Sequence, residues 1–344
     1  MRVRPRVRCA QIRLGAAIGQ RICCRGFSQK TSVSYAPLRK HAMLWDPERV
    51  AEWIHPAFQL ALDTLNQAHE HDAARVARAV VDKEASDVYS FRLLRDEVCS
   101  MLVEEIEHFQ ATGLPARRPN SMNNYGIVLN EIGMQPSLTA LQQRVLQPFA
   151  RALFPDVGSQ LDDHHTFCVS YRPEEDRGLD MHTDDSDVTL NVCLGREFEA
   201  SGLTFCGMLG EPAHRQVSHR YAHRLGRAIV HLGRRRHGAD DILSGHRVNM
   251  IMWSYNRAHR QTERYRFGAY AAETCAPDPV CVSFTHDRDY EAIRGVARPA
   301  AGGATFARTS WCPPRHAEYP GFEGCPGRYA HIDPVHADLP FRRK

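Results

Sequence analysis

The feature that most limits the fold of this chain is a series of short apolar runs between residues 166 and 255. Turn residues such as Gly, Pro and Asp separate five such runs, at 166–171, 188–194, 203–208, 227–232 and 248–255. Runs of this length suit β-strands, and this punctuation is typical of antiparallel sandwiches and barrels rather than parallel sheets. We therefore predict a jelly roll, in which strands that are not adjacent in sequence present their side chains at one barrel mouth.

Helical patterns precede these runs. Residues 46–80 have apolar side chains at near-helical spacing, and 95–111 predict an amphipathic helix in which Val98, Leu102, Ile106 and Phe109 share one face. A short strand is expected at 88–91, a second at 125–129, and a further helix at 138–154. The fold class is therefore α+β, with N-terminal supporting helices and a jelly-roll core.

Basic and acidic residues are distributed unevenly along the chain. Residues 1–45 carry ten of the 44 basic residues and no acidic residue, which leaves 34 basic and 40 acidic residues in the rest, a net charge of −6. The body of the protein is thus not a basic nucleic-acid binder by charge. We divide the chain into a basic leader (1–45), a helical support region (46–118), a jelly-roll region (119–256, core about 163–256) and an irregular extension (257–344).

The leader resembles a targeting segment. It is rich in Arg, and the stretch from Arg25 to Ser28 is similar to a mitochondrial processing site. The alternative is a basic extension without a targeting role. We expect an intracellular protein, with a mitochondrial location if the leader is used, because no hydrophobic signal core is present.

Composition argues against a membrane-spanning protein and against a disulfide-rich one. No apolar run approaches the ~18 residues that span a membrane. The 11 cysteines form no CxxC pair, and Cys168, Cys193 and Cys206 fall in apolar strand contexts, so free buried thiols in reducing surroundings are expected. Seven prolines between residues 299 and 344, with few aliphatic residues, argue against an independent core there.

Two of the strand regions carry side chains that can bind a metal. His182 and Asp184 are two residues apart, so on an extended backbone both point to one face. A second histidine is needed to complete a facial triad of two imidazoles and one carboxylate, the ligand set of non-haem Fe(II) oxygenases. This set leaves positions open for a cosubstrate and dioxygen.

The second histidine has several rivals, since six histidines lie between residues 214 and 246. His231 lies within an apolar strand and is expected to be a strand-face or core residue, while His246 should face away from its neighbour Arg247. We favour His237, in a turn that leads into the strand of Arg247.

Arg247 lies ten residues beyond His237, at the start of an apolar strand where a charge needs a partner. Its guanidinium can hold a carboxylate as a planar fork, as a 2-oxoglutarate site requires. Tyr171, which ends its strand, is a further candidate for binding this cosubstrate. Asn191 shares a strand face with Thr189 and is a weaker candidate for the pocket wall.

These residues lie in motifs that resemble the prolyl and lysyl hydroxylase-like superfamily of Fe(II)- and 2-oxoglutarate-dependent dioxygenases. The resemblance covers about residues 85–256 and is carried by these segments: Arg118-Pro-Asn120, Met122-Asn-Asn-Tyr-Gly126, Phe167-Cys-Val-Ser-Tyr171, Leu179-Asp-Met-His-Thr-Asp184, Val188-Thr-Leu-Asn-Val-Cys-Leu194, Leu203-Thr-Phe205, His231-Leu-Gly233 and His237-Gly-Ala239.

The resemblance implies a double-stranded β-helix in which His182, Asp184 and His237 bind Fe(II) and Arg247 holds 2-oxoglutarate. It further implies hydroxylation of a protein side chain, such as Pro or Lys, with O2 as oxidant, succinate and CO2 as products, and ascorbate to restore ferrous iron. Nucleic-acid demethylases of the superfamily usually have an arginine six residues after the cosubstrate arginine. This chain has Trp253 there, which argues against that branch.

Two other classes of function remain open. One is a non-catalytic binding module that keeps the oxygenase fold, although such a module needs no His/Asp/His/Arg set. The other is a zinc-dependent interaction protein that uses Cys312, His316, Cys325 and His331, but their spacings do not match a compact zinc finger.

Overall fold

The computed structural model describes residues 31–262 except 121, 196 and 209–218. The predicted processing site at Arg25 and the four candidate zinc ligands beyond residue 311 lie outside this described part. Within it, no helix is both long and apolar enough to cross a membrane.

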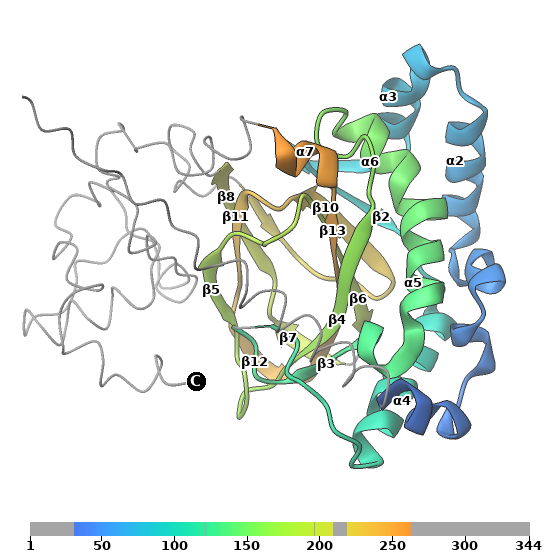
Figure 1. Cartoon of the computed structure of the whole chain (residues 1–344). Coiled ribbons are helices and arrows are strands. Elements are labelled where there is room, and N and C mark those ends of the chain that lie inside the picture. The colour runs from blue at the N-terminus through green and yellow to red at the C-terminus, as the bar shows by residue number, and fades with distance from the viewer. Residues whose placement is uncertain (1–30, 121, 196, 209–218, 263–344) are drawn as a thin grey trace, which may run out of the picture.

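Two antiparallel sheets and a short two-stranded ribbon form the core (Figure 1). The larger sheet has the strand order β1-β2-β10-β6-β13-β4-β3, and the smaller one has β5-β11-β8-β9. β7 and β12 pair as the ribbon. The strands span Asp82–Ala85 (β1), Val88–Arg92 (β2), Gly126–Val128 (β3), Asp163–Tyr171 (β4), Leu179–His182 (β5), Val188–Gly195 (β6), Phe198–Ala200 (β7), Leu203–Met208 (β8), His219–Tyr221 (β9), Arg227–Leu232 (β10), Arg235–Ala239 (β11), Ile242–Gly245 (β12) and Arg247–Tyr255 (β13).

The chain crosses repeatedly between the two sheets. β4, β6, β10 and β13 lie in the larger sheet, while the strands between them, β5, β8, β9 and β11, lie in the smaller one. This alternation defines a double-stranded β-helix, so the predicted jelly-roll core is confirmed. The five apolar runs are the strands β4, β6, β8, β10 and β13, and the strands expected at 88–91 and 125–129 are β2 and β3.

Helices cover the face of the larger sheet that points away from the smaller one (Figure 1). They span Pro56–Gln67 (α2), Glu70–Ala79 (α3), Asp96–Ala111 (α4), Gln135–Leu141 (α5) and Gln147–Leu153 (α6), and Arg257–Gln261 (α7) follows the last strand. Phe58 of α2 stacks on Phe91 of β2 and on Phe149 of α6, with ring centroids 4.3 and 4.8 Å apart. These buried rings join the helical layer to the sheet, because burying aromatic surface is a major source of packing energy.

The helical region differs in detail from the sequence-based expectation. Residues 46–80 form three pieces rather than one, a 3-10 helix at Pro47–Trp53 followed by α2 and α3. The first break precedes Pro56, which has no amide hydrogen and so begins a helix. Single π-helical turns flank α5 at Asn130–Met134 and Gln142–Leu146.

The described part of the chain includes residues 31–45, which the sequence analysis assigned to the leader. Short 3-10 helices occupy Ala36–Leu38 and Ala42–Trp45. Tyr35 and Leu44 are both fully buried in the main hydrophobic core. The Tyr35 hydroxyl donates to the buried Glu105 carboxylate on α4 at 2.5 Å, and this carboxylate also accepts the backbone N–H of His41. Residues 35–45 are therefore part of the fold.

Candidate metal and cosubstrate site

The two candidate histidines meet because their strands are neighbours in the smaller sheet. His237 of β11 pairs directly with His182 of β5, although 55 residues separate them in sequence. Their ring centroids are 4.4 Å apart. The expectation that His237 lies in a turn is wrong. β11 includes Arg235 and Arg236, whose charges conceal the apolar alternation that would mark a strand, and both side chains are buried.

Asp184 completes a compact group of three ligand side chains. β5 ends at His182, and Asp184 follows two residues later with its backbone N–H bonded to the carbonyl of Gly233 at 2.9 Å. A side chain at Gly233 would collide with the carbonyl of Ser186, so only glycine permits this close approach of the two loops. One potential ligand atom from each of His182, Asp184 and His237 lies within 4.8 Å of the others.

The carboxylate of Asp184 is held by neighbours that favour its charged form. Its Oδ1 lies 3.3 Å from His182 Nε2, its Oδ2 lies 3.7 Å from His237 Nε2, and the Thr189 hydroxyl donates to Oδ2 at 2.6 Å. Burial alone would raise the pKa of this carboxyl, but the two histidines more than offset that effect and hold the pKa well below its usual range. The carboxylate is therefore ionised and available to a cation.

The protonation state of His237 also suits a metal ligand. Burial lowers its pKa to about 3, so the ring is neutral at physiological pH. Its Nδ1 lies 3.0 Å from the Arg235 carbonyl, which can only accept, so Nδ1 carries the hydrogen. Nε2 is then left with a lone pair that faces Asp184 and His182. A backbone contact that fixes the tautomer in this way is typical of metal-binding histidines.

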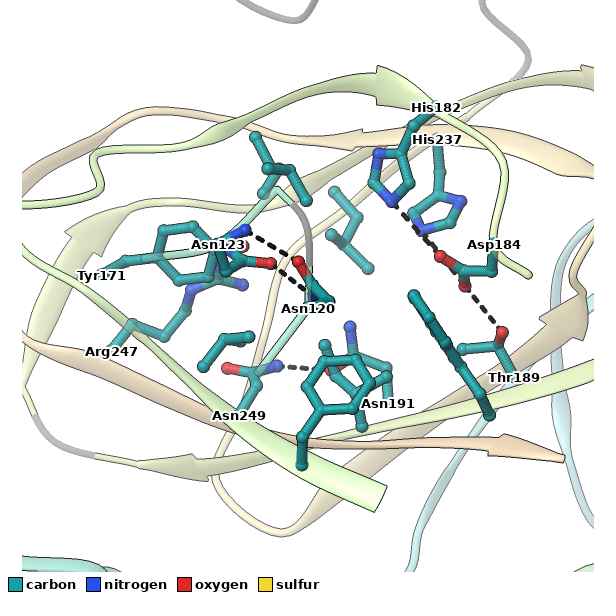
Figure 2. Close-up of a pocket in the computed structure, with 17 residues that line it drawn as sticks. Asn120, Asn123, Tyr171, His182, Asp184, Thr189, Asn191, His237, Arg247 and Asn249 are labelled. Atoms are coloured by element: carbon teal, nitrogen blue, oxygen red, sulfur yellow. Dashed lines mark hydrogen bonds and ion pairs between the residues drawn. The ribbon is translucent and has the colours of Figure 1, made fainter. Parts of the chain in front are cut away.

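Arg247 and Tyr171 lie at the other end of the same pocket (Figure 2). They are direct partners on the paired strands β13 and β4, and the Arg247 guanidinium carbon lies 4.4 Å above the Tyr171 ring centroid. Arg247 is 1% exposed, yet among the described residues it makes no hydrogen bond or ion pair, and its Nε has no partner. Burial lowers the pKa of Arg247 from its very high usual value.

Two of the rejected histidines, His231 and His246, are not among the three ligand side chains, although the His231 ring centroid lies 4.5 Å from that of His237. The His246 ring contacts the Ser170 hydroxyl at 2.8 Å and Arg172 at 3.2 Å, and it lines a different hollow, beside α4. His231 is fully buried on β10, and its ring packs edge-on against Phe205. Neither belongs to the group of ligand side chains.

Several pocket residues escaped the sequence analysis. Asn249 and Trp253 line the pocket with Arg247 because alternate residues of β13 share one face, a period-two signal that the sequence does contain. Asn191, the weaker candidate, also lines the pocket and accepts a hydrogen bond from Asn249 at 2.6 Å. Asn120 and Asn123 come from an irregular segment before β3, where no periodicity could have indicated them.

The cysteines lie where the sequence predicted them. Cys168, Cys193 and Cys206, together with Cys99, are buried and form no disulfide within the described part of the chain.

Comparison with known proteins identifies relatives of this chain. Residues 32–159 match a family model described as an OGFOD2-like domain. The 2-oxoglutarate and iron-dependent oxygenase domain-containing protein 2 of Danio rerio is 37% identical over 272 residues, which cover 76% of this chain and 75% of that protein. Protein ICU11 of Arabidopsis thaliana, also named a 2-oxoglutarate and iron-dependent oxygenase domain-containing protein, is 38% identical over 52% of this chain and 48% of its own length.

More distant proteins are similar to parts of the chain. A multifunctional procollagen lysine hydroxylase and glycosyltransferase of Rattus norvegicus is 28% identical over 59% of this chain and 26% of its own. A solved prolyl-4-hydroxylase of Pseudomonas putida aligns at 14% identity over 60% of this chain and 97% of that chain, with a TM-score of 0.37. The fold assignment rests on the strand order given above.

Proposed function

Because the chain belongs to the family of the 2-oxoglutarate and iron-dependent oxygenase domain-containing protein 2, we propose that it is a dioxygenase that hydroxylates a protein side chain, such as Pro or Lys. Fe(II) would be held by His182, Asp184 and His237. When bound, it allows O2 to decarboxylate 2-oxoglutarate to succinate and CO2, with the second oxygen atom hydroxylating a substrate C–H bond. Ascorbate is proposed as the reductant that restores ferrous iron.

The observation that carries this proposal is the buried Arg247, whose guanidinium has no hydrogen-bond or ion-pair partner among the described residues. A buried guanidinium without a counterion is costly, and a carboxylate of the cosubstrate would supply the missing charge in bidentate geometry. The donor set at the other end, two imidazole nitrogens and one carboxylate oxygen, is the set that non-haem Fe(II) enzymes use. A molecule with a metal-chelating group and a distal carboxylate, as 2-oxoglutarate has, matches both ends.

The residues of the pocket have separate roles in this reaction. Arg247 binds and orients the cosubstrate, and Tyr171 adds a hydroxyl beside it. Thr189 keeps the Asp184 carboxylate in place. Phe167, Ile251 and Trp253 give the pocket an apolar wall, which limits the access of water to the reacting groups.

The test is succinate release by the purified full chain with Fe(II), 2-oxoglutarate and ascorbate, challenged with peptide libraries that contain Pro or Lys and, in parallel, with nucleic-acid libraries. We expect peptide-stimulated succinate release and a mass increase of one oxygen atom on the peptide. Stimulation by nucleic acid alone would contradict the proposed substrate class. Metal and 2-oxoglutarate binding without turnover on any substrate would favour the non-catalytic module.

We also propose that the basic segment before residue 31 directs the protein to an organelle. Its acid-free composition and the Arg25 site support this proposal. Sequencing the N-terminus of the protein isolated from its native cell should give a mature end near Ser28, whereas an intact Met1 or Arg2 would contradict import.

A further inference from the structure

The hydroxyl of Tyr171 has one hydrogen-bond partner among the described residues, and that partner is a donor. Asn123 Nδ2 lies 3.0 Å from the hydroxyl oxygen, and both side chains are almost completely buried. An amide nitrogen can only donate, so the hydroxyl oxygen accepts this bond. The hydrogen of the Tyr171 hydroxyl is therefore still available to a different acceptor.

The neighbouring Asn120 fixes the direction of this bond, because it determines which atom of the Asn123 amide faces Tyr171. Asn120 Oδ1 accepts the backbone N–H groups of Met122 at 2.8 Å and Asn123 at 2.7 Å. Since its oxygen faces two donors, Asn120 Nδ2 is the atom that points to Asn123 Oδ1, at 3.0 Å. Asn123 must then present its nitrogen to Tyr171. A flipped amide at either position would place donors against donors.

The free hydrogen of Tyr171 lies beside a cation that also lacks an acceptor. The Arg247 guanidinium sits over the Tyr171 ring, and Figure 2 shows both side chains at the end of the pocket opposite His182 and Asp184. Two groups of buried donors with no acceptor from the described protein residues define a place for an anion. The two asparagines line the same pocket, on the side of Tyr171.

We propose that Asn120 and Asn123 are positioning residues that force the Tyr171 hydroxyl to act as a donor, and that this donor binds the distal carboxylate of 2-oxoglutarate next to Arg247. The inference rests on the proposed function, because it assumes that 2-oxoglutarate is the anion. It adds a directional relay of hydrogen bonds, from the backbone of Met122 and Asn123 through the two amides to the phenol.

A separate set of contacts anchors the same segment and provides a control. Asn124 donates its backbone N–H and its Nδ2 to the Asp176 carboxylate, at 2.7 and 2.9 Å. Asp176 belongs to the loop after β4, and Asn124 makes no contact with the Tyr171 hydroxyl. Loss of this anchor should disturb the segment without reversing the donor direction of the relay.

The experiment is a double-mutant cycle on 2-oxoglutarate affinity, measured by calorimetry on the full chain with Mn(II) in place of iron so that no turnover occurs. Tyr171→Phe should weaken binding on the order of tenfold, because it removes a hydrogen bond to a charged group. Asn123→Ala should weaken binding several-fold, and the double variant should bind no worse than Tyr171→Phe. Asn123→Asp should bind more weakly than Asn123→Ala, since a carboxylate there would take the Tyr171 hydrogen for itself.

The matched control is Asn124→Ala, whose effect should multiply with that of Tyr171→Phe rather than vanish in the double variant. If Asn123→Ala does not fold, Asn120→Ala serves in the same cycle, since it frees the Asn123 amide to flip. Unchanged affinity in a folded Asn123→Ala protein, or effects of Asn123→Ala and Tyr171→Phe that multiply, would overturn the relay. Failure of the wild-type protein to bind 2-oxoglutarate with Mn(II) would instead overturn the proposed function.

Discussion

The two ends of the pocket are electrostatic opposites. At one end the buried Asp184 carboxylate is surrounded by two histidines and a hydroxyl, an arrangement that keeps it charged and open to a metal. At the other end the buried Arg247 guanidinium has no carboxylate partner in the described part of the chain. At the first end the described protein residues themselves surround the charge, whereas at the second end they supply no counterion. This difference separates metal binding from cosubstrate binding and lets each be tested alone.

Loss of a ligand at the carboxylate end should have the largest effect. Replacing His182, Asp184 or His237 by Ala should abolish measurable binding of Fe(II) under anaerobic titration, because two ligands no longer form a facial triad. His246→Ala is the matched control, since its ring contacts Ser170 and lines a different hollow, beside α4. Loss of metal in the His246 variant, with retention in the His237 variant, would reverse the ligand assignment.

Acid should lower the free energy of unfolding of the protein, because a neutral buried histidine lies at or near each end of the pocket. Burial lowers the pKa of His237 to about 3 and that of His223, near Arg247, well below its usual value. The same cause lowers the pKa of His164, outside the pocket, to about 4. Each of these groups binds a proton in the unfolded chain at a higher pH than in the folded protein. The stability that they contribute is complete above pH ~6.5 and is lost as the pH falls toward the folded pKa values.

Urea denaturation of the metal-free protein across this range is the measurement. The protonation of His164 alone should lower the free energy of unfolding by roughly 3 kcal/mol at pH ~4. His164→Gln should therefore flatten the dependence of the unfolding free energy on pH. Identical slopes for the two proteins would show that His164 is not neutral in the folded state.

Truncation of Arg247 should leave metal binding intact and weaken the binding of 2-oxoglutarate. Arg247→Ala should raise the dissociation constant of 2-oxoglutarate about 100-fold, since a charge-assisted pair is lost. Arg247→Lys keeps the charge but loses the planar fork. Its dissociation constant for 2-oxoglutarate should therefore lie between those of the wild-type and Arg247→Ala proteins. The absorption of the Fe(II) chelate, followed during a 2-oxoglutarate titration, reports this affinity. Unchanged affinity in an iron-loaded Arg247→Ala protein would mean that another residue holds the distal carboxylate.

The smallest expected effect comes from the hydroxyl that supports Asp184. Thr189 donates to Oδ2 of Asp184 at 2.6 Å and contacts the Ser186 hydroxyl at 2.6 Å. Thr189→Val has nearly the same shape but no donor, and should weaken metal binding on the order of tenfold. Thr189→Ser keeps the donor and should restore most of the affinity. Equal metal affinity in the wild-type and Val proteins would leave Thr189 with a packing role only.

Chemical identity and strand pattern explain how much of this site the sequence could predict. Arg247 begins a strand whose apolar pattern was visible, whereas His182 and Asp184 could be related by their two-residue spacing on an extended backbone. β11 was missed because Arg235 and Arg236 interrupt that pattern, although both are buried. The short strands β1, β5, β7, β9 and β12 were missed because none has more than four residues.

The sequence by itself determined the chemistry of the protein: a His-x-Asp pair, a later His with an Arg ten residues beyond it, and enough short apolar runs to build a jelly roll. These are properties of residue type and spacing, which a linear pattern records. Only the tertiary structure decided that His182 and His237 are cross-strand partners, that Arg247 has no counterion among the described residues, and that Asn123 directs the Tyr171 hydroxyl. Those relations join residues 48 to 55 positions apart or depend on a missing partner. They exist only once the two sheets have packed together.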